Sequence, residues 1–262
     1  MNEAIRLVLS KELIILDGDG TLYIGSKPLP GAREFIRFLD EHGKRFVVMT
    51  NNSSFSKEHH IRRLSRILRR RFSLNEVLVS TEAAIEYLRE LGVRRVYALG
   101  TPEFIQDLIR SGITHDPGNP EVVLIAFDKT LTYGKLVRAV RHIMSGVPYI
   151  VVNPDVLCPT DRGYIPDAGS IWALIRAATG KEPVAVTGKP SSLFLNYMLR
   201  KLNVKPSDSV IIGDRLYTDI AMANENDIDS ILVLTGETRA EDLVNSRYKP
   251  TLVVNTLIDI LK

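Results

Sequence analysis

The feature that most constrains this chain is an apolar run, residues 13–16, that ends abruptly at two carboxylates spaced two residues apart. The residues after the run are Asp17-Gly18-Asp19-Gly20-Thr21. A short run that is apolar on both faces and bounded by turn residues is typical of a buried strand in a parallel sheet. Functional groups in open α/β sheets gather just outside the carboxyl ends of such strands. Two acids placed there repel each other unless a cation lies between them or one of them holds a proton.

These two acids fit the chemistry of a phosphoryl transferase that works through a carboxylate. Asp17 is the candidate nucleophile, because a carboxylate can attack phosphorus and divide one difficult displacement into two easier steps. Asp19 is placed to protonate the leaving oxygen and later to deprotonate the attacking water. Gly18 and Gly20 lack Cβ atoms, so backbone N–H groups at this turn can approach a phosphate closely.

A calcium-binding loop is the alternative interpretation of the same motif, with Asp17, Asp19 and Thr21 as its first three ligand positions. It fails because Leu22 stands where the loop needs glycine and Pro28 stands where it needs a bidentate glutamate. The segment before the motif is also strand-like rather than helical.

Strand-like and helix-like segments alternate from end to end, which predicts an α/β fold. A helical pattern follows residue 30 and ends near Gly43, and an arginine-rich helix follows the second strand. Residues 153–169 are rich in Pro, Asp and Gly and predict a loop. Helices are expected to begin near Ser170, Ser191 and Thr218. The expected strands cover residues 13–16, 45–49, 77–80, 96–99, 122–127, 149–152, 184–186, 209–212 and 231–234.

Composition excludes several classes of protein. Of 262 residues, 45% are hydrophobic and 25% charged, which is ordinary for a globular chain, and a net charge of +3 does not by itself indicate nucleic acid. Cys158 is the only cysteine, so no intrachain disulfide can form. No apolar run approaches the length of a membrane span, and residues 1–12 lack the apolar core of a signal peptide. We therefore expect a cytoplasmic protein without a membrane or nucleic-acid partner.

One basic cluster stands out against this background. Its spacing predicts the solvated face of an amphipathic helix, and an anionic partner is the alternative. The cluster consists of Arg62, Arg63, Arg66, Arg69, Arg70 and Arg71.

Two further motifs follow predicted strands. Thr50 and Asn51 could hold a phosphoryl oxygen, or serve only as a helix cap. Lys189 lies between a strand and a helix, where its ammonium could neutralise both the nucleophile and the phosphoryl group, although a lone lysine is more often surface charge.

A second pair of acids follows the strand at 209–212. Asp214 suits direct ligation of Mg²⁺, and Asp219 suits an outer-shell role, with complementarity to a helix dipole as the simpler alternative. Four carboxylates (Asp17, Asp19, Asp214 and Asp219) against Lys189 would resist an anionic substrate. The sequence therefore predicts dependence on Mg²⁺.

In this order the motifs resemble those of the haloacid dehalogenase-like hydrolase superfamily, and within it the NagD / p-nitrophenyl phosphatase group. The resemblance covers essentially the whole chain. The motifs of the narrower group are Thr50-Asn51-Asn52-Ser53-Ser54, Asn153-Pro154-Asp155, Asp167-Ala168-Gly169-Ser170 and Gly213-Asp214-Arg215-Leu216-Tyr217-Thr218-Asp219.

The resemblance implies a Rossmann-like, doubly wound parallel-sheet core formed by residues 1–78 and 185–262. It also implies an α/β cap domain, residues 79–184, inserted after the second motif. The long segment between Thr50 and Lys189 agrees, because it far exceeds what one crossover needs.

The resemblance also implies the roles of the site residues. Asp17 is nucleophile and metal ligand, Asp19 is the acid/base and ligates metal through its backbone carbonyl, and Asp214 completes the metal site. Thr50, Asn51 and Lys189 bind phosphate. Gly18 departs from the family, which usually carries a bulkier apolar residue there.

We accordingly expect a phosphatase that hydrolyses a small phosphorylated metabolite through an aspartyl-phosphate. The alternatives are a phosphotransferase or mutase with the same intermediate, and a phospho-ligand sensor that turns over negligibly. Asn153, Asp155 and Gly169 are the candidate substrate contacts from the cap, and enzymes with such caps often pair through them. Asp128, followed by Lys129 and Thr130, resembles the phosphorylation motif of ion-pumping ATPases but lacks its glycine, so we interpret it as a loop and helix start.

Overall fold

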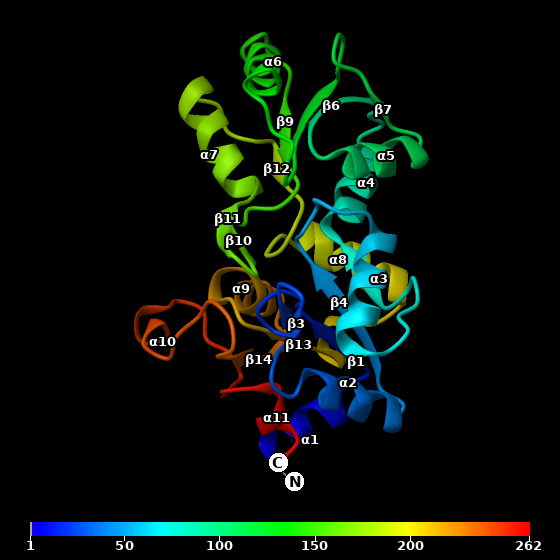
Figure 1. Ribbon diagram of the computed structural model, residues 1–262, viewed down its shortest axis with the longest axis vertical. Coiled ribbons are helices and arrows are strands. Elements are labelled where there is room, and N and C mark those ends of the chain that lie inside the picture. The colour runs from blue at the N-terminus through cyan, green and yellow to red at the C-terminus, as the bar shows by residue number, and fades with distance from the viewer. Residues whose placement is uncertain (1) are drawn as a thin grey trace.

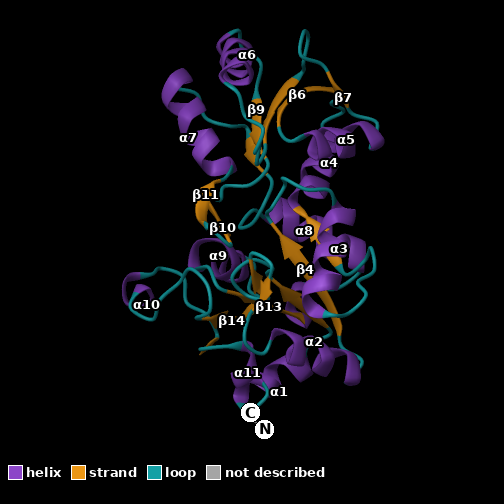
Figure 2. Ribbon diagram, viewed as in Figure 1, coloured by secondary structure: helices purple, strands orange, loops and turns teal. Residues whose placement is uncertain are grey.

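A computed structural model of the chain describes residues 2–262. Its strands form a 6-stranded and a 5-stranded sheet together with two 2-stranded hairpins. Figure 1 shows an elongated molecule with one large sheet in each lobe and both termini at the far end of the larger sheet's lobe. In Figure 2 the strands of each lobe lie between helices. The predicted α/β class is confirmed.

The strands divide cleanly between the sheets. The larger sheet consists of β1 (Leu13–Leu16), β4 (Arg45–Thr50), β5 (Val77–Val79), β13 (Ser209–Gly213), β14 (Asp229–Val233) and β15 (Leu252–Val254). The smaller sheet consists of β6 (Arg95–Leu99), β7 (Thr114–His115), β8 (Val122–Ile125), β9 (Tyr149–Val151) and β12 (Ala185–Val186). The hairpins are β2 (Tyr23–Ile24) with β3 (Lys27–Pro28), and β10 (Leu157–Thr160) with β11 (Gly163–Pro166).

The helices follow the same division. The larger sheet is covered by α1 (Glu3–Ser10), α2 (Ala32–Glu41), α3 (Lys57–Leu68), α8 (Ser192–Leu202), α9 (Ala221–Glu225) and α11 (Leu257–Ile260). The smaller sheet is covered by α4 (Ser80–Glu90), α5 (Pro102–Arg110), α6 (Tyr133–Met144) and α7 (Ala168–Thr179). The remaining elements are α10 (Asp242–Asn245), the 3₁₀ turn η1 (Pro206–Asp208) and the π-helical turn η2 (Leu216–Ile220).

The larger sheet is parallel throughout, in the order β15-β14-β13-β1-β4-β5. Side chains of β1 alternate between two cores: Ile14 and Leu16 pack with α2 and α3, whereas Leu13 and Ile15 pack with α8 and α9. Burial on both faces explains why this strand is a continuous apolar run rather than an alternating one.

The smaller sheet is also parallel, in the order β12-β9-β8-β6-β7. Helix α4 connects the two lobes, because Ala83 lies in a core of the larger sheet and Leu88 lies in a core of the smaller one. The domain division at residues 79 and 184 stays a prediction. Strand β12 begins just after this division and pairs with β9 of the smaller sheet.

The expectation of a loop over residues 153–169 is wrong. Strands β10 and β11 form an antiparallel hairpin there, with Leu157 opposite Pro166 and Thr160 opposite Gly163. Proline is depleted in strands, so Pro159 and Pro166 hide the strand pattern in the sequence. The hairpin extends from the smaller lobe toward the larger sheet (Figure 1).

The topology itself assembles three of the motifs. Strands β13, β1 and β4 are neighbours in one parallel sheet, so their carboxyl ends lie side by side. The residues that follow these ends are Asp214, Asp17 and Asn51. Among residues 2–262, no helix is both long and apolar enough to cross a membrane.

Candidate active site

Four charged side chains meet at the carboxyl edge of the larger sheet. One oxygen from each of Asp17, Asp214 and Asp219 lies within 4.8 Å of the others, and all three residues are buried. Nζ of Lys189 donates to Oδ1 of Asp17 at 2.5 Å and to Oδ1 of Asp219 at 2.8 Å. Lys189 is only 3% exposed, and attraction between opposite charges is strong in such a water-poor place. Residues far apart in the sequence therefore share one site.

Three carboxylates against one lysine leave this cluster with an excess of negative charge. Burial raises the pKa of Asp17 well above its usual range; Lys189 opposes the rise, and Asp219 and Asp214 add to it. Burial and the neighbouring Asp219 likewise raise the pKa of Asp214. Burial by itself would lower the pKa of Lys189, but Asp17 and Asp219 raise it, so the lysine stays charged. A divalent cation among the three acids would relieve their repulsion.

Asp214 is held in place by the loops after β1 and β14. Its Oδ1 accepts from Thr21 Oγ1 at 3.3 Å and its Oδ2 accepts from the backbone N–H of Glu237 at 2.8 Å. Gly20 has φ +98°, and a Cβ there would lie 2.4 Å from Oδ2 of Asp214. Only glycine combines this backbone conformation with so close an approach.

Asp19 lies beside this cluster and has partners of its own. The hydroxyl of Tyr23 donates to its Oδ2 at 3.1 Å, and a guanidinium nitrogen of Arg63 lies 3.6 Å from its Oδ1. Burial raises the pKa of Asp19, while Arg63 and Tyr23 lower it; the balance is a raised pKa. A raised pKa suits a carboxyl that must first hold a proton and then give it up.

Thr50 and Asn51, at the end of β4, are both buried. The side chain of Asn51 accepts from the backbone N–H of Lys189 at 2.8 Å and donates to the Lys189 carbonyl at 3.0 Å. Asn51 thereby fixes the loop that carries the lysine. Oγ1 of Thr50 accepts from the N–H of Asn52 at 3.2 Å, in a local turn.

A cavity of about 20 Å³ lies among these residues, with room for about one water molecule. The predicted site residues that line it are Asp17, Asp19, Thr50, Asn51 and Asp155.

The predicted cap contacts have different surroundings. Asp155 reaches the site, since its Oδ1 accepts from Asn51 at 3.2 Å. Asn153 accepts from Ser53 Oγ at 3.0 Å and donates to Asp167 at 3.0 Å, so it joins loops of the two lobes. Gly169 donates its backbone N–H to the Asp155 carbonyl at 2.8 Å. Neither Asn153 nor Gly169 is among the residues that line this cavity.

Arg215 is a site residue that sequence reasoning did not single out. It is 7% exposed, its guanidinium lies 2.9 Å from both Asp155 and Glu237, and its backbone N–H donates to Asp219 at 3.3 Å. Its place directly after Asp214 was the only available signal.

Comparisons with known proteins agree with this arrangement. Residues 14–114 match the family model described as haloacid dehalogenase-like hydrolase, and residues 186–260 match one described as HAD-hydrolase-like. An acid sugar phosphatase of Staphylococcus saprophyticus is 31% identical over 250 residues, which cover 95% of this chain and 96% of the relative. The chain belongs to the haloacid dehalogenase-like hydrolases.

Solved structures narrow the placement within these hydrolases. A 4-nitrophenylphosphatase from Thermotoga maritima has a TM-score of 0.90 and 41% identity, covering 96% of both chains. NagD from E. coli K-12 has a TM-score of 0.86 and 26% identity, covering 95% of this chain and 97% of NagD. A glycerol phosphate phosphatase from Mycobacterium tuberculosis, in complex with magnesium, has a TM-score of 0.88 and 28% identity, covering 97% and 78%. The chain is a NagD-like haloacid dehalogenase-like hydrolase and, as an enzyme, a phosphoric monoester hydrolase.

Proposed function

We propose that this hydrolase is a Mg²⁺-dependent phosphatase that acts on a small phosphorylated metabolite through an aspartyl-phosphate on Asp17. The observation that carries the proposal is the convergence of Asp17, Asp214, Asp219 and Lys189 beside a separately held Asp19. One carboxylate is thus placed as nucleophile and another as proton carrier, as a two-step displacement requires.

The residues fit a divalent cation. Buried carboxylate oxygens are ligands suited to Mg²⁺. The single positive charge of Lys189 does not balance the negative charge of three acids. Asp17, Asp214 and the Asp19 carbonyl would hold the ion. Asp219 suits an outer role, because its two oxygens already accept from Lys189 and from the Arg215 N–H. Bound there, the ion would supply positive charge to offset that of the phosphoryl oxygens.

The first chemical step joins Asp17 to phosphorus. Lys189 holds Oδ1 of Asp17, so Oδ2 is the oxygen left to attack. As the Asp17 oxygen–phosphorus bond forms, the ester oxygen–phosphorus bond breaks, and Asp19 gives its proton to the leaving oxygen. Lys189 stays charged throughout and offsets the negative charge at Asp17 and the phosphoryl group.

The second step returns the enzyme to its starting state. Asp19, now ionised, takes a proton from a water molecule that attacks phosphorus. The Asp17–phosphorus bond breaks, and inorganic phosphate leaves. One water is consumed for each ester hydrolysed.

A phosphate-release assay over a library of phosphomonoesters, with Mg²⁺ or with EDTA, tests the proposal. We expect release only with Mg²⁺ and almost none from Asp17→Asn. A library that includes acceptor alcohols separates hydrolysis from phosphoryl transfer, since transfer gives new phosphate esters. Tight binding of phosphate with unchanged, negligible turnover in Asp17→Asn would favour the sensor instead.

We also propose that two copies of the chain pair through the cap. Size-exclusion chromatography with light scattering tests it: a dimer that cap substitutions dissociate supports it, and a monomer contradicts it.

A further inference from the structure

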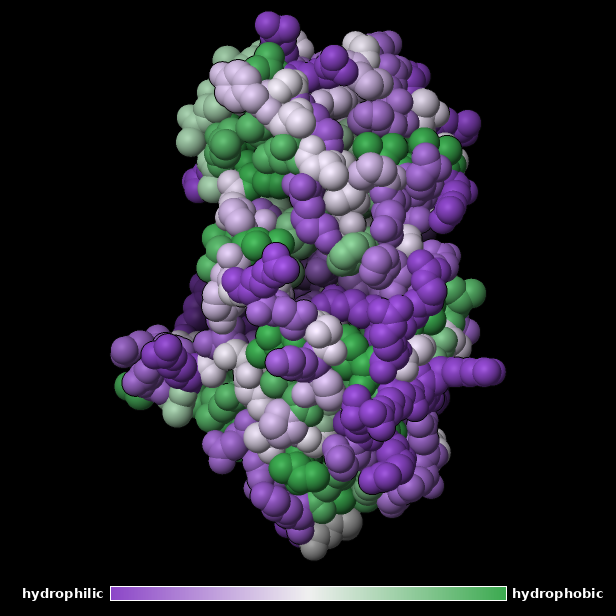
Figure 3. Space-filling view, viewed as in Figure 1, coloured by the Kyte–Doolittle hydropathy of each residue, from purple (hydrophilic) through white to green (hydrophobic). Residues whose placement is uncertain are grey.

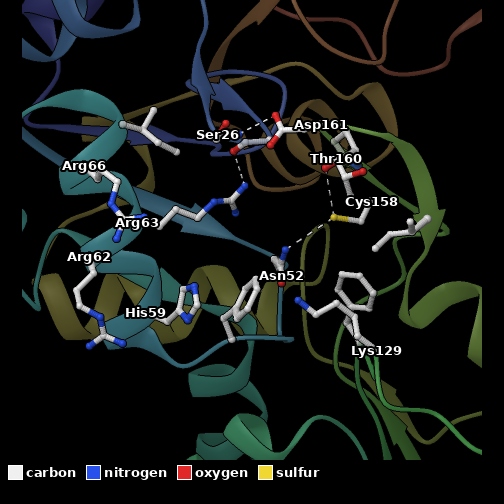
Figure 4. A pocket seen from close by; sticks show the side chains of 16 residues that line it. Ser26, Asn52, His59, Arg62, Arg63, Arg66, Lys129, Cys158, Thr160 and Asp161 are labelled. Carbon is white, nitrogen blue, oxygen red and sulfur yellow. Dashed lines mark hydrogen bonds between the residues drawn. The ribbon is translucent and has the colours of Figure 1, made fainter.

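A second cavity, of about 480 Å³, lies next to the catalytic residues. It shares Asn52, Cys158 and Pro159 with the small cavity around Asp17, so the two are adjacent. Its walls come from α3, the turn between β2 and β3, the β10–β11 hairpin and the segment after β8 (Figure 4). Its volume is that of a site for a small molecule. A group bound there would be the leaving group of an ester whose phosphorus lies at Asp17.

The lining of this cavity is strongly cationic. Arg62, Arg63, Arg66 and Lys129 line it, and Asp161 is the one acid among the 16 lining residues. Figure 3 shows hydrophilic side chains gathered around the waist between the two lobes, the region where this cavity lies. The remaining walls include aromatic rings of Phe55 and Phe127.

Most of this positive charge has no partner in the protein. Asp161 accepts from the backbone N–H of Ser26 at 3.0 Å, and Arg63 is occupied by Asp19 and by the Gly25 carbonyl. Among residues 2–262, no carboxylate lies within ion-pair distance of Arg62, Arg66 or Lys129.

Lys129 is held over the Phe55 ring, with its Nζ 3.4 Å from the ring centroid. The ring positions this cation without neutralising it. Three like charges around one cavity repel each other, and an anion between them would remove that repulsion.

We propose that the substrate carries a second anionic group, a carboxylate or a second phosphate, on the alcohol that leaves. This inference rests on the proposed function. The phosphoryl group to be transferred lies at Asp17, and the second anion lies against Arg62, Arg66 and Lys129. These residues select the substrate; they do not take part in the chemistry.

Matched aromatic esters test this directly: 3-carboxyphenyl phosphate against 3-carbamoylphenyl phosphate, which differ by one charge at nearly equal shape. The carbamoyl ester has the better leaving group, so chemistry alone would favour it. We expect the wild-type enzyme to prefer the carboxylate by about tenfold in kcat/KM, since each of three exposed ion pairs contributes about a twofold preference. The preference falls as salt is added, because salt screens exposed charges.

The double variant Arg66→Gln/Lys129→Gln removes two of these three ion pairs. We expect it to lower the preference to about twofold. Arg71→Gln is the matched control, because Arg71 is an exposed arginine of the same cluster but does not line the cavity. We expect it to retain the full preference. Circular dichroism confirms that each variant is folded.

A third ester, 1,3-phenylene bisphosphate, distinguishes the two kinds of anion. A preference for it over 3-carboxyphenyl phosphate indicates a second phosphate, and the reverse indicates a carboxylate. Equal kcat/KM for all three esters overturns this inference while leaving the phosphatase intact. Failure to hydrolyse any of them contradicts the proposed function itself.

Discussion

Lys189 is the residue on which the electrostatics of the site depend. Its ammonium contacts two of the three clustered acids, and its backbone is fixed by Asn51. The sequence alone does not distinguish Lys189 from a surface lysine, because Asp17 and Asp219 contact its ammonium only in the folded protein.

Lys189→Met therefore removes the only lysine from the acid cluster. We expect kcat/KM to fall by about 10³-fold, in line with loss of one preorganised donor to a developing charge. Lys135→Met is the control, since Lys135 pairs with the buried Asp128 at 2.6 Å in the other lobe. It should lower the melting temperature without a comparable loss of activity. Equal losses of activity in both variants would contradict a specific role for Lys189.

Gly18, the departure from the family pattern, has an explanation at the same scale. A Cβ at Gly18 would lie 2.9 Å from the hydroxyl oxygen of Tyr23, which donates to Asp19. The glycine leaves room for this tyrosine. The pair was not predictable, because it depends on how the β2–β3 hairpin folds over the motif.

Tyr23→Phe tests that arrangement through the pH dependence of kcat. Burial raises the pKa of Asp19 and the Tyr23 hydroxyl lowers it, so loss of the hydroxyl should raise it further. Asp19 acts as an acid when protonated, so the alkaline limb of the profile should move to higher pH. A limb that stays in place would show that Tyr23 does not tune Asp19.

At the scale of elements, α3 joins the sheet to the cavity. Leu64 and Ile67 pack on the larger sheet, as the periodicity predicts, whereas Arg62 and Arg66 line the cavity rather than facing only bulk solvent. Buried His60 anchors its first turn, with Nε2 2.9 Å from the Asn52 carbonyl. Asn52 lines both cavities, so this contact links the helix to the site.

His60 should make stability depend on pH. Burial lowers the pKa of His60 from 6.5 to about 3, so between those values the unfolded chain binds the extra proton and the folded chain does not. The free energy of unfolding contributed by His60 therefore falls as pH falls, by about 2 kcal/mol from pH 7 to pH 5.

Urea unfolding at both pH values measures this dependence. His60→Gln should lack that part of the decline, and the exposed His42→Gln should keep it. Identical declines in all three proteins would contradict the assignment to His60.

The elements also show how far the sequence predicts the fold. Strands buried on both faces, such as β1 and β13, were recognisable because no polar residue interrupts them. The β10–β11 hairpin was not, since its prolines break the strand pattern, yet it supplies Cys158, Pro159 and Asp161 to the cavity. The acids at strand ends were predictable from position. Their partners were not predictable. These side chains reach the acids only through contacts between separate elements, and a local sequence pattern does not indicate such contacts; the partners are Arg215, Tyr23 and Arg63.

At the scale of the whole molecule, the site lies where the two lobes meet. Asp155 comes from the smaller lobe and bonds to Asn51 and Arg215 of the larger one. Closure of the lobes would exclude water from the reaction and select the leaving group. The ion itself would join residues of the larger lobe that are far apart in the sequence, Asp17, Asp19 and Asp214.

Mg²⁺ should therefore stabilise the whole chain. An ion that binds only the folded state adds about 2.7 kcal/mol at 100 times its Kd, which raises the melting temperature. Asp214→Asn should lose most of this rise, and an equal ionic strength of NaCl should not reproduce it. If Mg²⁺ raises the melting temperatures of the wild-type protein and of Asp214→Asn by the same amount, the proposed site is contradicted.

The location of the phosphoryl group during turnover tests the account most directly. In Asp19→Asn, an activated ester such as 4-nitrophenyl phosphate can still transfer its phosphoryl group, but water is no longer deprotonated to release it. After an acid quench and peptide mass spectrometry, we predict one phosphoryl group on the peptide that contains Asp17, and none in Asp17→Asn/Asp19→Asn. Phosphate release by the wild-type enzyme with no phosphorylated Asp17 in Asp19→Asn would contradict the account.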